Sequence, residues 1–470
     1  MLKDFFLTRI KNNFPHEATP EQNLALEKLS DFLFSREDEA LFLLKGYAGT
    51  GKSSLVGALV KTMTEMEQKT VLMAPTGRAA KVFSFYAGQN AYTIHKKIYR
   101  QKMFSNEPTG FVPADNLHKH TLFIVDEASM ISNDGLDSFS FGSGRLLDDL
   151  IHYVYSGEGC RLLLMGDSAQ LPPVSQPDSP ALDAELLKGY NLDVEHITLT
   201  QVVRQNAMSG ILTNATHLRS AITEDNVNIF PQLITKNQQD VVIVRGDELI
   251  ETIENSYSKV GIEENIIITR SNKRANVFNN GIRNRILYRE EALSSGDLLM
   301  ISKNNYFWGK EQKEIDFIAN GDLIEVLKVK KIEEIYGFKF ANLLVRFPDY
   351  NLEMDLKIVM ESLFSDTPNL PKEQNDKLFY TILEDYADIR TKPERMRKMK
   401  ENPYYNAVQV KYAYSVTCHK AQGGQWKNVF LDISYIPEEY LGLDFYRWLY
   451  TAFTRATERI FLINPAKEMV

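Results

Sequence analysis

Residues 40–53, ALFLLKGYAGTGKS, predict how the N-terminal half of the chain folds. The apolar beginning of this stretch has the length of a buried strand, and residues 46–53 fit the pattern G-x-x-x-x-G-K-[ST]. In such a loop the glycines allow backbone N–H groups to surround a polyphosphate at a helix N-terminus, while Lys52 reaches the β and γ phosphates and Ser53 binds Mg²⁺. We therefore expect a strand, a loop and a helix that together hold a nucleoside triphosphate.

The segments around this loop alternate short apolar runs with helical patterns, which is typical of a parallel sheet with crossover helices. A second set of apolar runs follows further along the chain and resumes near the C-terminus. The simplest prediction is an α/β fold with two sheet domains. The runs of the first set lie at residues 40–46, 70–77, 121–128, 161–167 and 196–200, and the second set begins at 241–246 and 265–272.

The two portions of the second set of apolar runs are separated by a region with a different sequence pattern. Residues 296–359 alternate strand-like runs with turn signals, as a small antiparallel barrel does. Residues 360–405 are helical and charged, and they include the basic stretch KPERMRKMK at 392–400. We therefore predict an insertion that makes the second sheet domain discontinuous.

The stretch TLFIVDEAS, residues 121–129, supplies the acidic residues that a phosphate-binding loop needs for hydrolysis. Asp126 would hold Mg²⁺, and Glu127 could polarise a water molecule for attack on the γ-phosphate. An Asp-Glu pair at a strand end is more often a helix cap. Its distance from the phosphate-binding loop favours the catalytic interpretation here.

Three further residues are candidates for the phosphate end of the site. Gln170 stands before two prolines in GDSAQLPPV, residues 166–174, and a rigid loop can hold such an amide against the γ-phosphate. The alternative is an ordinary proline-bearing loop. Arg204 and Arg455 come from distant segments and could stabilise the charge that develops in phosphoryl transfer, although a lone arginine is more often part of a surface ion pair.

The composition excludes several other classes of protein. A chain of 470 residues has room for roughly three domains. It has two cysteines and no signal-peptide pattern, which predicts an intracellular, cytoplasmic protein. No apolar run approaches the ~20 residues that cross a bilayer. The net charge of −8 neither requires nor excludes a local basic groove for nucleic acid.

Cys418 and His419 are adjacent in YSVTCHKAQGGQW, residues 414–426, and raise the question of nucleophilic or metal chemistry. Neighbours on an extended chain point to opposite faces, which argues against a catalytic dyad. A zinc site needs about four ligands, and the other cysteine, Cys160, has no histidine pair at finger spacing. The sequence therefore argues against both a catalytic dyad and a zinc site in this segment.

Taken in order, these segments resemble the helicase motifs of superfamily 1, and specifically the 1B branch with its RecD-like and Dda-like members. The resemblance spans about residues 18–463. It implies two RecA-like domains with ATP and Mg²⁺ between them, 5′-to-3′ translocation on single-stranded DNA, and duplex unwinding. The matching stretches are ATPEQNLAL, GYAGTGKS, APTGRAAK, YTIHKKI, VDEAS, GDSAQLPPV, LTQVVRQ, YSVTCHKAQGGQW and YTAFTRATE.

The resemblance assigns an adenine contact to Gln22 and makes Arg204 and Arg455 the γ-phosphate arginines. Val203 departs from the related 1A branch, where an aromatic residue stacks on adenine, so base selectivity would depend mostly on Gln22. The expected catalytic residues are Lys52, Asp126, Glu127, Gln170, Arg204 and Arg455. The expected ATP-binding residues are Gln22, Gly46, Ala48, Gly49, Thr50, Gly51, Lys52, Ser53, Ser54, Gln170, Arg204, Gly423 and Arg455, with Ser53 and Asp126 on the metal.

The same resemblance implies that each RecA-like domain has a group of residues that binds single-stranded DNA, and we call each group a DNA hold. Hydroxyls, amides and backbone N–H groups bind phosphates, and small residues let the strand approach. His95 has the alternative of a core histidine, and Cys418 is expected to pack inward as a small apolar residue. The expected DNA-binding residues are Thr76, Gly77, Arg78, Thr93, His95, Lys96, Thr417, His419 and Lys420.

The expected domain boundaries follow from the resemblance and from the changes in sequence pattern along the chain. Residues 1–200 would form domain 1A, 201–295 with 406–470 domain 2A, and 296–405 an SH3-like domain 2B with a helical extension at about 360–405. Residues 392–400 are either a DNA contact or a solvated face. A strand-separating pin is expected at about 99–119, with Phe104 and Phe111 meeting the duplex end, unless this segment is an ordinary surface hairpin.

The sequence motifs are also compatible with two other functions. The motifs also fit an RNA-directed helicase, because phosphate contacts ignore the sugar unless a 2′-OH is recognised. A second possibility is an ATP-gated DNA-binding subunit that does not unwind. We expect a monomer that acts on single strands and duplex forks in replication, repair or recombination, with partner proteins of those processes and no membrane association.

Overall fold

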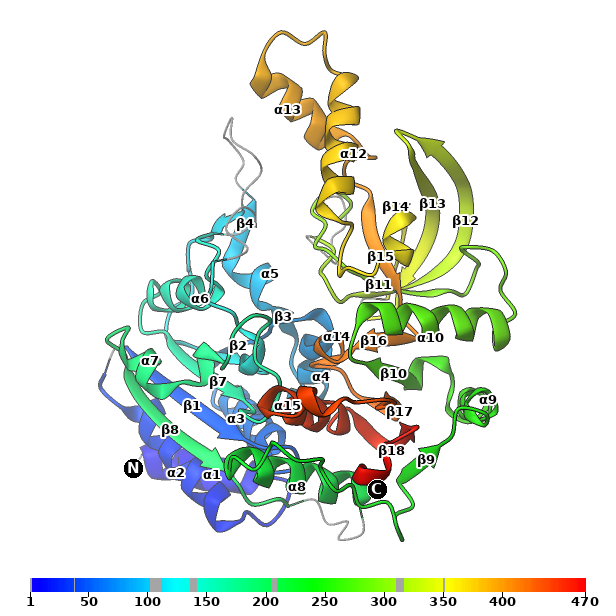
Figure 1. Ribbon diagram of the computed structural model, residues 1–470. Coiled ribbons are helices and arrows are strands. Elements are labelled where there is room, and N and C mark those ends of the chain that lie inside the picture. Colours follow the sequence, from blue (N-terminus) through cyan, green and yellow to red (C-terminus); the bar gives the residue numbers. More distant parts are fainter. Residues whose placement is uncertain are drawn as a thin grey trace.

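The computed structural model describes residues 2–37, 39–101, 111–135, 142–203, 209–309, 317–349 and 351–470 (Figure 1). The part of the chain that we call domain 1 is built on a six-stranded parallel sheet in the order β3-β2-β6-β7-β1-β8. Its strands are β1 (Ala40–Gly46), β2 (Lys69–Ala74), β3 (Ala91–Thr93), β6 (Thr121–Val125), β7 (Arg161–Gly166) and β8 (Asp193–Leu199).

Helices cover both faces of this sheet because its central strands are apolar on both faces. In β1, Phe42 and Leu44 belong to one core, whereas Leu41 and Leu43 belong to the core on the opposite face. The first core contains α1 (Leu2–Asn13), α2 (Pro20–Phe34), α3 (Lys52–Glu65) and α4 (Gly77–Ala87), and the second contains α5 (Ile94–Ile98), α6 (Leu146–Tyr155) and α7 (Ala184–Lys188).

The part that we call domain 2 is built on a five-stranded parallel sheet in the order β16-β10-β17-β18-β9. Its strands are β9 (Val241–Val244), β10 (Asn265–Thr269), β16 (Ser415–Thr417), β17 (Trp426–Asp432) and β18 (Ala456–Ile463). Its helices are α8 (Gly210–Thr223), α9 (Leu249–Val260), α10 (Asn272–Arg285), α14 (Cys418–Ala421) and α15 (Leu443–Phe453).

Between α10 and β16 the chain leaves domain 2 and forms a closed five-stranded barrel. The barrel strands are β11 (Leu298–Ile301), β12 (Leu323–Ile335), β13 (Phe338–Phe347), β14 (Leu352–Val359) and β15 (Val408–Tyr412). Three helices separate β14 from β15, and the last two project beyond the barrel in Figure 1. These helices are α11 (Glu361–Phe364), α12 (Lys372–Glu384) and α13 (Lys392–Glu401).

This architecture confirms the predicted fold class of two parallel-sheet domains with an inserted barrel. A small hairpin of β4 (Tyr99–Gln101) and β5 (Phe111–Pro113) also lies where the pin is expected. Phe104 falls outside the described residues, and only the backbone of Phe111 is described, paired with Gln101. The strand-separating role and the domain boundaries stay predictions.

The basic stretch at 392–400 forms α13, whose charges are partly paired within the helix. Arg397 lies 3.5 Å from Glu401, and Lys398 lies 3.4 Å from the same carboxylate. Exposed pairs of this kind contribute at most about 1 kcal/mol and leave the cations available to other anions. The alternatives of a DNA contact and a solvated face therefore both stay open.

A buried ion-pair network connects the barrel to domain 2, and we call it the Asp297 joint. Asp297 is fully buried before β11 and accepts hydrogen bonds from Arg283 at 3.1 Å and Arg289 at 2.7 Å. The Tyr414 hydroxyl, just after β15, donates to the same carboxylate at 3.0 Å. Both connections to the barrel thus meet at one carboxylate, and leaving it without partners would be costly.

Among the described helices, none combines the length and the apolar character that a bilayer-spanning helix requires.

Candidate active site

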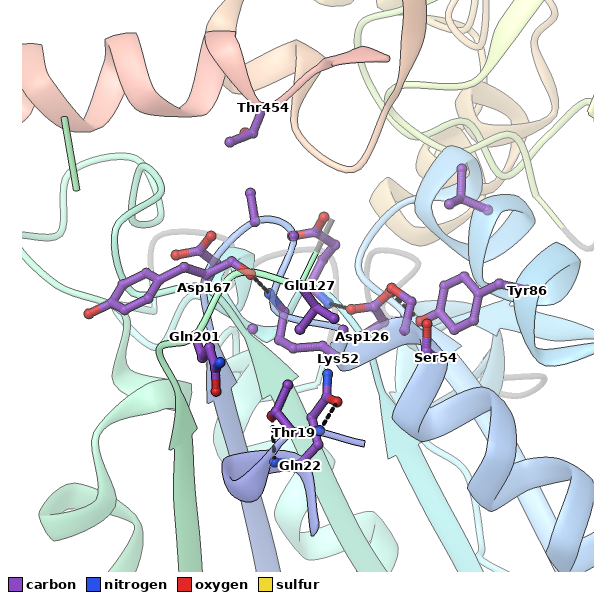
Figure 2. A pocket seen from close by; sticks show the side chains of 18 of the residues that line it. Thr19, Gln22, Lys52, Ser54, Tyr86, Asp126, Glu127, Asp167, Gln201 and Thr454 are labelled. Atoms are coloured by element: carbon purple, nitrogen blue, oxygen red, sulfur yellow. Dashed lines mark hydrogen bonds between the residues drawn. The ribbon is translucent and has the colours of Figure 1, made fainter. Parts of the chain in front are cut away.

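A cavity of about 790 Å³ lies between domain 1 and domain 2, and both contribute to its walls (Figure 2). Gly46 and Thr50 belong to the phosphate-binding loop but do not line the cavity, and Arg204 lies outside the described residues. The expected ATP-site residues that do line the cavity are Gln22, Ala48, Gly49, Gly51, Lys52, Ser53, Ser54, Asp126, Glu127, Gln170, Gly423 and Arg455.

The phosphate-binding loop joins β1 to α3 and has the backbone that its glycines permit. Gly49 and Gly51 have φ angles of 78° and 89°, in the left-handed region that favours glycine. The Lys52 ammonium folds back and donates to the carbonyl oxygens of Gly46 at 2.5 Å and Tyr47 at 3.0 Å. The loop therefore satisfies its lysine internally, and a phosphate would compete with those carbonyls for it.

Gln22 lies in the first turn of α2, where it fastens this helix to the phosphate-binding loop. Its amide oxygen accepts from Thr19 N at 3.0 Å, and its amide nitrogen donates to Thr50 O at 2.9 Å. A Cβ atom on Gly51 would overlap the Gln22 amide. Gln22 lines the cavity in this arrangement, but both ends of its amide have protein partners, and its adenine contact stays a prediction.

Asp126 and Glu127 follow β6 at the base of the cavity. One Asp126 oxygen accepts from the Tyr86 hydroxyl at 2.7 Å and the other from Glu127 N at 2.7 Å. Burial, together with the neighbouring charge of Glu127, raises the pKa of Asp126 to about 7. Glu127 has a φ of 52°, and a non-glycine residue held in this region is a feature that clusters at functional sites.

Ser53 and Asp126 fit a magnesium ion that arrives with a nucleotide. Both present oxygen atoms, which Mg²⁺ prefers, and both interact with the same Tyr86 hydroxyl. The described residues hold no group of three His, Cys, Asp or Glu side chains that could bind a metal alone. A cation here would therefore take its remaining ligands from phosphate oxygens and water.

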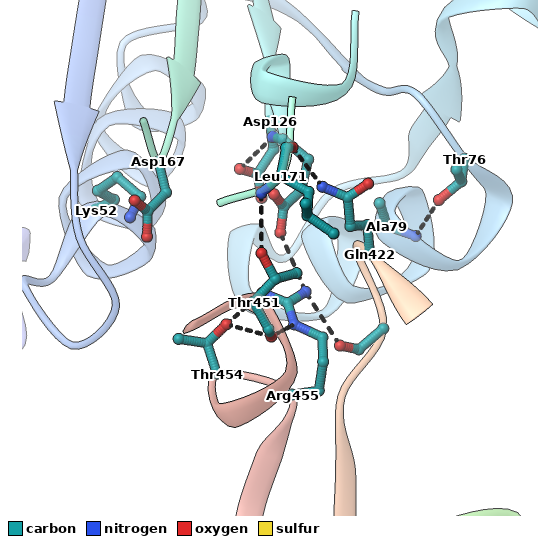
Figure 3. A network of polar contacts seen from close by, with 12 residues as sticks. Lys52, Thr76, Ala79, Asp126, Asp167, Leu171, Gln422, Thr451, Thr454 and Arg455 are labelled. Carbon is teal, nitrogen blue, oxygen red and sulfur yellow. Dashed lines mark hydrogen bonds and ion pairs between the residues drawn. The ribbon is translucent and has the colours of Figure 1, made fainter. Parts of the chain in front are cut away.

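Arg455 lies at the end of α15 and faces domain 1 from across the cavity (Figure 3). It is 4% exposed, and its guanidinium lies 3.8 Å from the Glu127 carboxylate. The Thr451 and Gly424 carbonyls accept from the same guanidinium at 3.2 and 3.3 Å. This arginine is thus buried between the domains rather than paired on the outer surface, while its contact with the γ-phosphate stays a prediction.

The loop that carries Gln170 is bound to domain 2 through the backbone N–H and carbonyl groups of Leu171. Leu171 N donates to the Thr451 hydroxyl at 2.9 Å, and Leu171 O accepts from the Gln422 amide at 2.7 Å (Figure 3). Gln170 lines the cavity, and its buried amide oxygen has no hydrogen-bond partner among the described residues. The loop can therefore transmit a change at the cavity to domain 2.

Tyr450 is a site residue that the sequence motifs did not identify. Its hydroxyl accepts from Ala48 N of the phosphate-binding loop at 2.9 Å and donates to Asp167 of domain 1 at 2.6 Å. Burial raises the pKa of Tyr450 well above its ordinary value, so the hydroxyl stays protonated and able to donate. The one signal in the sequence is its place in YTAFTRATE, ahead of Arg455.

Five of the nine residues expected to bind DNA line two smaller cavities. One of about 290 Å³ separates domain 1 from the barrel, and Gly77, Thr93 and Lys96 line it opposite Phe317 and Asp349. The other lies between α10 and the barrel base, and Thr417 and Lys420 form part of its wall. His419 is exposed. The structure therefore arranges most of the two expected holds along the face where the barrel meets the sheet domains.

Arg78 lines neither of these two cavities and contacts domain 2 instead. Its guanidinium donates to Gln425 O at 3.1 Å and lies 3.9 Å from the centre of the Trp426 ring, both in domain 2. Burial lowers the pKa of Arg78 to about 10. Arg78 thus forms a contact between the domains in this structure, which its place in a DNA-binding motif did not predict.

Three other expected residues have local structural roles. The Thr76 and Thr93 hydroxyls accept from Ala79 N and Lys96 N, each at 3.2 Å, and so cap α4 and α5. Burial lowers the pKa of His95 to about 4, which keeps this imidazole neutral at pH 7.

Cys418 packs into the core of domain 2 with no exposed surface, as expected, and burial raises the pKa of its thiol to about 12. This thiol is therefore not a nucleophile.

Comparisons with known proteins match both halves of the chain. Residues 18–233 match the model of an AAA domain, and residues 412–463 match that of a UvrD-like helicase C-terminal domain. An uncharacterized protein of Acanthamoeba polyphaga mimivirus is 23% identical over 94% of this chain and 98% of its own length.

The relatives whose names describe an activity include two DNA helicases. The ATP-dependent RecD2 DNA helicase of Deinococcus radiodurans is 32% identical over 37% of this chain and 21% of its own length. The ATP-dependent DNA helicase dda of Enterobacteria phage T4 is 23% identical over 61% of this chain and 62% of its own length. The chain therefore spans less than two thirds of each of these helicases.

Proposed function

We propose that this chain is a superfamily 1B helicase that uses ATP hydrolysis to move 5′ to 3′ along single-stranded DNA and to open the duplex ahead. Its two domain matches and its similarity to the RecD2 and Dda helicases support this proposal. The observation that carries the proposal is the position of Arg455. This arginine of domain 2 faces Glu127 of domain 1 across a cavity that the phosphate-binding loop lines.

Hydrolysis would begin with the exchange of internal partners for phosphate oxygens. Lys52 would leave the carbonyls of Gly46 and Tyr47 for the β and γ phosphates of ATP. Arg455 would leave Glu127 for the γ-phosphate, which frees the Glu127 carboxylate to orient the attacking water. Ser53 and Asp126 would hold Mg²⁺, which neutralises charge on the phosphates when it is bound.

Movement along DNA would follow because the domain motion that opens and closes the nucleotide cavity also moves the DNA-binding residues of the two domains relative to each other. Domain 1 presents Gly77, Thr93 and Lys96 to the strand, and domain 2 presents Thr417 and Lys420. Closing and opening the cavity changes the distance between these holds, and the strand advances if their affinities alternate with the nucleotide state. The cost of a base-pair step, about 1.4 kcal/mol on average, is well below what ATP hydrolysis supplies.

The proposal is tested by unwinding of duplexes that carry either a 5′ or a 3′ single-stranded tail. We expect activity only with the 5′ tail, loss of activity in Lys52→Ala, and normal activity in the control Lys61→Ala, an exposed lysine of the same helix. Unwinding from the 3′ tail would contradict the polarity. ATP hydrolysis that DNA stimulates without any unwinding would support the non-unwinding subunit instead, and stimulation by RNA alone would support an RNA-directed enzyme.

We also propose that the active form is a monomer, since the two sheet domains that line the nucleotide cavity belong to the same chain. The two unpaired cysteines of the chain support a cytoplasmic location. Light scattering on the purified protein with and without a single-stranded oligonucleotide measures the mass of the active species. A mass twice that of one chain on DNA would contradict the monomer.

A further inference from the structure

Tyr86, in the last turn of α4, contacts both residues that fit the metal ion. Its hydroxyl donates to one oxygen of Asp126 at 2.7 Å (Figure 2), and it lies near enough to the Ser53 side chain for that side chain to act on the pKa of Tyr86. Its ring stacks on the fully buried Phe83 at a centroid distance of 5.1 Å. Packing therefore fixes this hydroxyl at the point where the two oxygen ligands converge.

The contact with Tyr86 leaves Asp126 able to bind a cation. Each carboxylate oxygen of Asp126 accepts one hydrogen bond, from Tyr86 or from Glu127 N. A carboxylate has about four lone-pair sites, so lone pairs remain for a metal ion. The two donors fix the plane of the carboxylate without filling it, which is how residues outside the metal's own ligands orient those ligands.

The other end of α4 lies at the expected DNA hold. Gly77 begins the helix and lines the cavity between domain 1 and the barrel, and Arg78 packs on Trp426 of domain 2. A helix of 11 residues is about 16 Å long and behaves as a rigid rod over that length. Displacement of its first turn by a bound strand would thus reach Tyr86 at its last turn.

We propose that Tyr86 is a positioning residue for the divalent cation, and that α4 makes cation binding respond to the DNA strand. The first statement depends only on nucleotide binding at the cavity. The second rests on the proposed function, because it requires a strand at Gly77. Tyr86 orients Asp126 and Ser53 from one side, and DNA acts on that orientation through the helix.

The test measures Mn²⁺ binding to protein loaded with a non-hydrolysable ATP analogue, by electron paramagnetic resonance of the free ion. In Tyr86→Phe we expect Mn²⁺ to bind about tenfold more weakly, because mutation of residues that orient a metal ligand typically costs 10- to 100-fold in affinity. Tyr155→Phe is the matched control: it also removes a tyrosine hydroxyl of domain 1, one that donates to Ala40 O at 2.9 Å, and it should leave Mn²⁺ affinity unchanged.

Equal or tighter Mn²⁺ binding in Tyr86→Phe, or the same loss in Tyr155→Phe, would overturn the positioning role. Thermal unfolding of both variants in the absence of metal separates this role from general destabilisation. A thymidine oligonucleotide is then added. The wild type should change its Mn²⁺ affinity and Tyr86→Phe should respond less, whereas an equal response in both would overturn the relay through α4. A wild type that binds no oligonucleotide would refute the proposed function, while the measurement without DNA still decides the role of Tyr86.

Discussion

Substitution of Tyr450 by phenylalanine should slow ATP hydrolysis without weakening nucleotide binding. The change removes only the hydroxyl that links α15 to Ala48 N and to Asp167. Because α15 ends beside Arg455, this link sets the position of the arginine relative to the phosphate-binding loop. The loop, with Lys52 and Ser53, is otherwise intact in the variant.

The size of the effect follows from the bonds lost. A hydrogen bond to a charged group contributes about 1.5–3 kcal/mol, and one to a neutral backbone group about 1 kcal/mol. Asp167 keeps a second donor, Ala169 N, at 3.0 Å, and the cavity admits water to Ala48 N, so part of the loss is recovered. A net loss of about 2 kcal/mol corresponds to roughly 30-fold in the equilibrium between closed and open domains.

The assay is steady-state ATP hydrolysis with and without single-stranded DNA, together with the Kd of a fluorescent nucleotide. We expect kcat to fall by roughly 10- to 30-fold, while the nucleotide Kd changes less than about threefold. Tyr446→Phe is the control, because the Tyr446 hydroxyl lies one turn earlier on α15 and bonds to Ile229 O at 2.9 Å. An unchanged kcat in Tyr450→Phe, or an equal fall in Tyr446→Phe, would refute the reasoning.

Three further predictions concern the loop and the DNA holds. Gly51→Ala should abolish nucleotide binding in a fluorescence titration, because a Cβ there overlaps the Gln22 amide at a φ of 89°; retained affinity would contradict it. Burial lowers the pKa of Lys420 to about 8, so its charge is lost as pH rises through that value, and affinity for single-stranded DNA should fall between pH 7 and pH 9. Lys420→Arg should remove this dependence, and a pH profile that survives the substitution would argue against the assignment. His95 is neutral at pH 7; hence His95→Gln should leave the salt dependence of DNA binding unchanged, whereas Lys96→Gln should reduce its slope by about 0.7.

The sequence predicted those parts of the site that are contiguous along the chain. Residues 46–53 and Asp126 with Glu127 follow apolar runs that could only be buried strands, and parallel strands bring their carboxyl ends to one edge. The barrel was predicted from strand-like runs that alternate with turn signals. Local order and hydrophobic pattern were sufficient in these cases.

Arg455 was expected at the site through the resemblance, but other contacts between distant segments were not predictable. Tyr86 and Tyr450 belong to ordinary amphipathic helices, and only the tertiary arrangement brings their hydroxyls to Asp126 and Asp167. Arg78 lies in a motif associated with DNA yet packs on Trp426, because the close approach of the domains offers its guanidinium an aromatic face. Period and spacing carry no information about such contacts.

The Asp297 joint has a mechanical consequence. Because its buried carboxylate holds both connections of the barrel, we expect the barrel with α12 and α13 to turn together with domain 2 if the nucleotide cavity opens or closes. In Figure 1 these helices stand at the end of the molecule remote from α15, so they lie far from the cavity about which the two domains would move. A small rotation of domain 2 at the cavity would therefore displace Lys392–Glu401 further than it displaces Arg455.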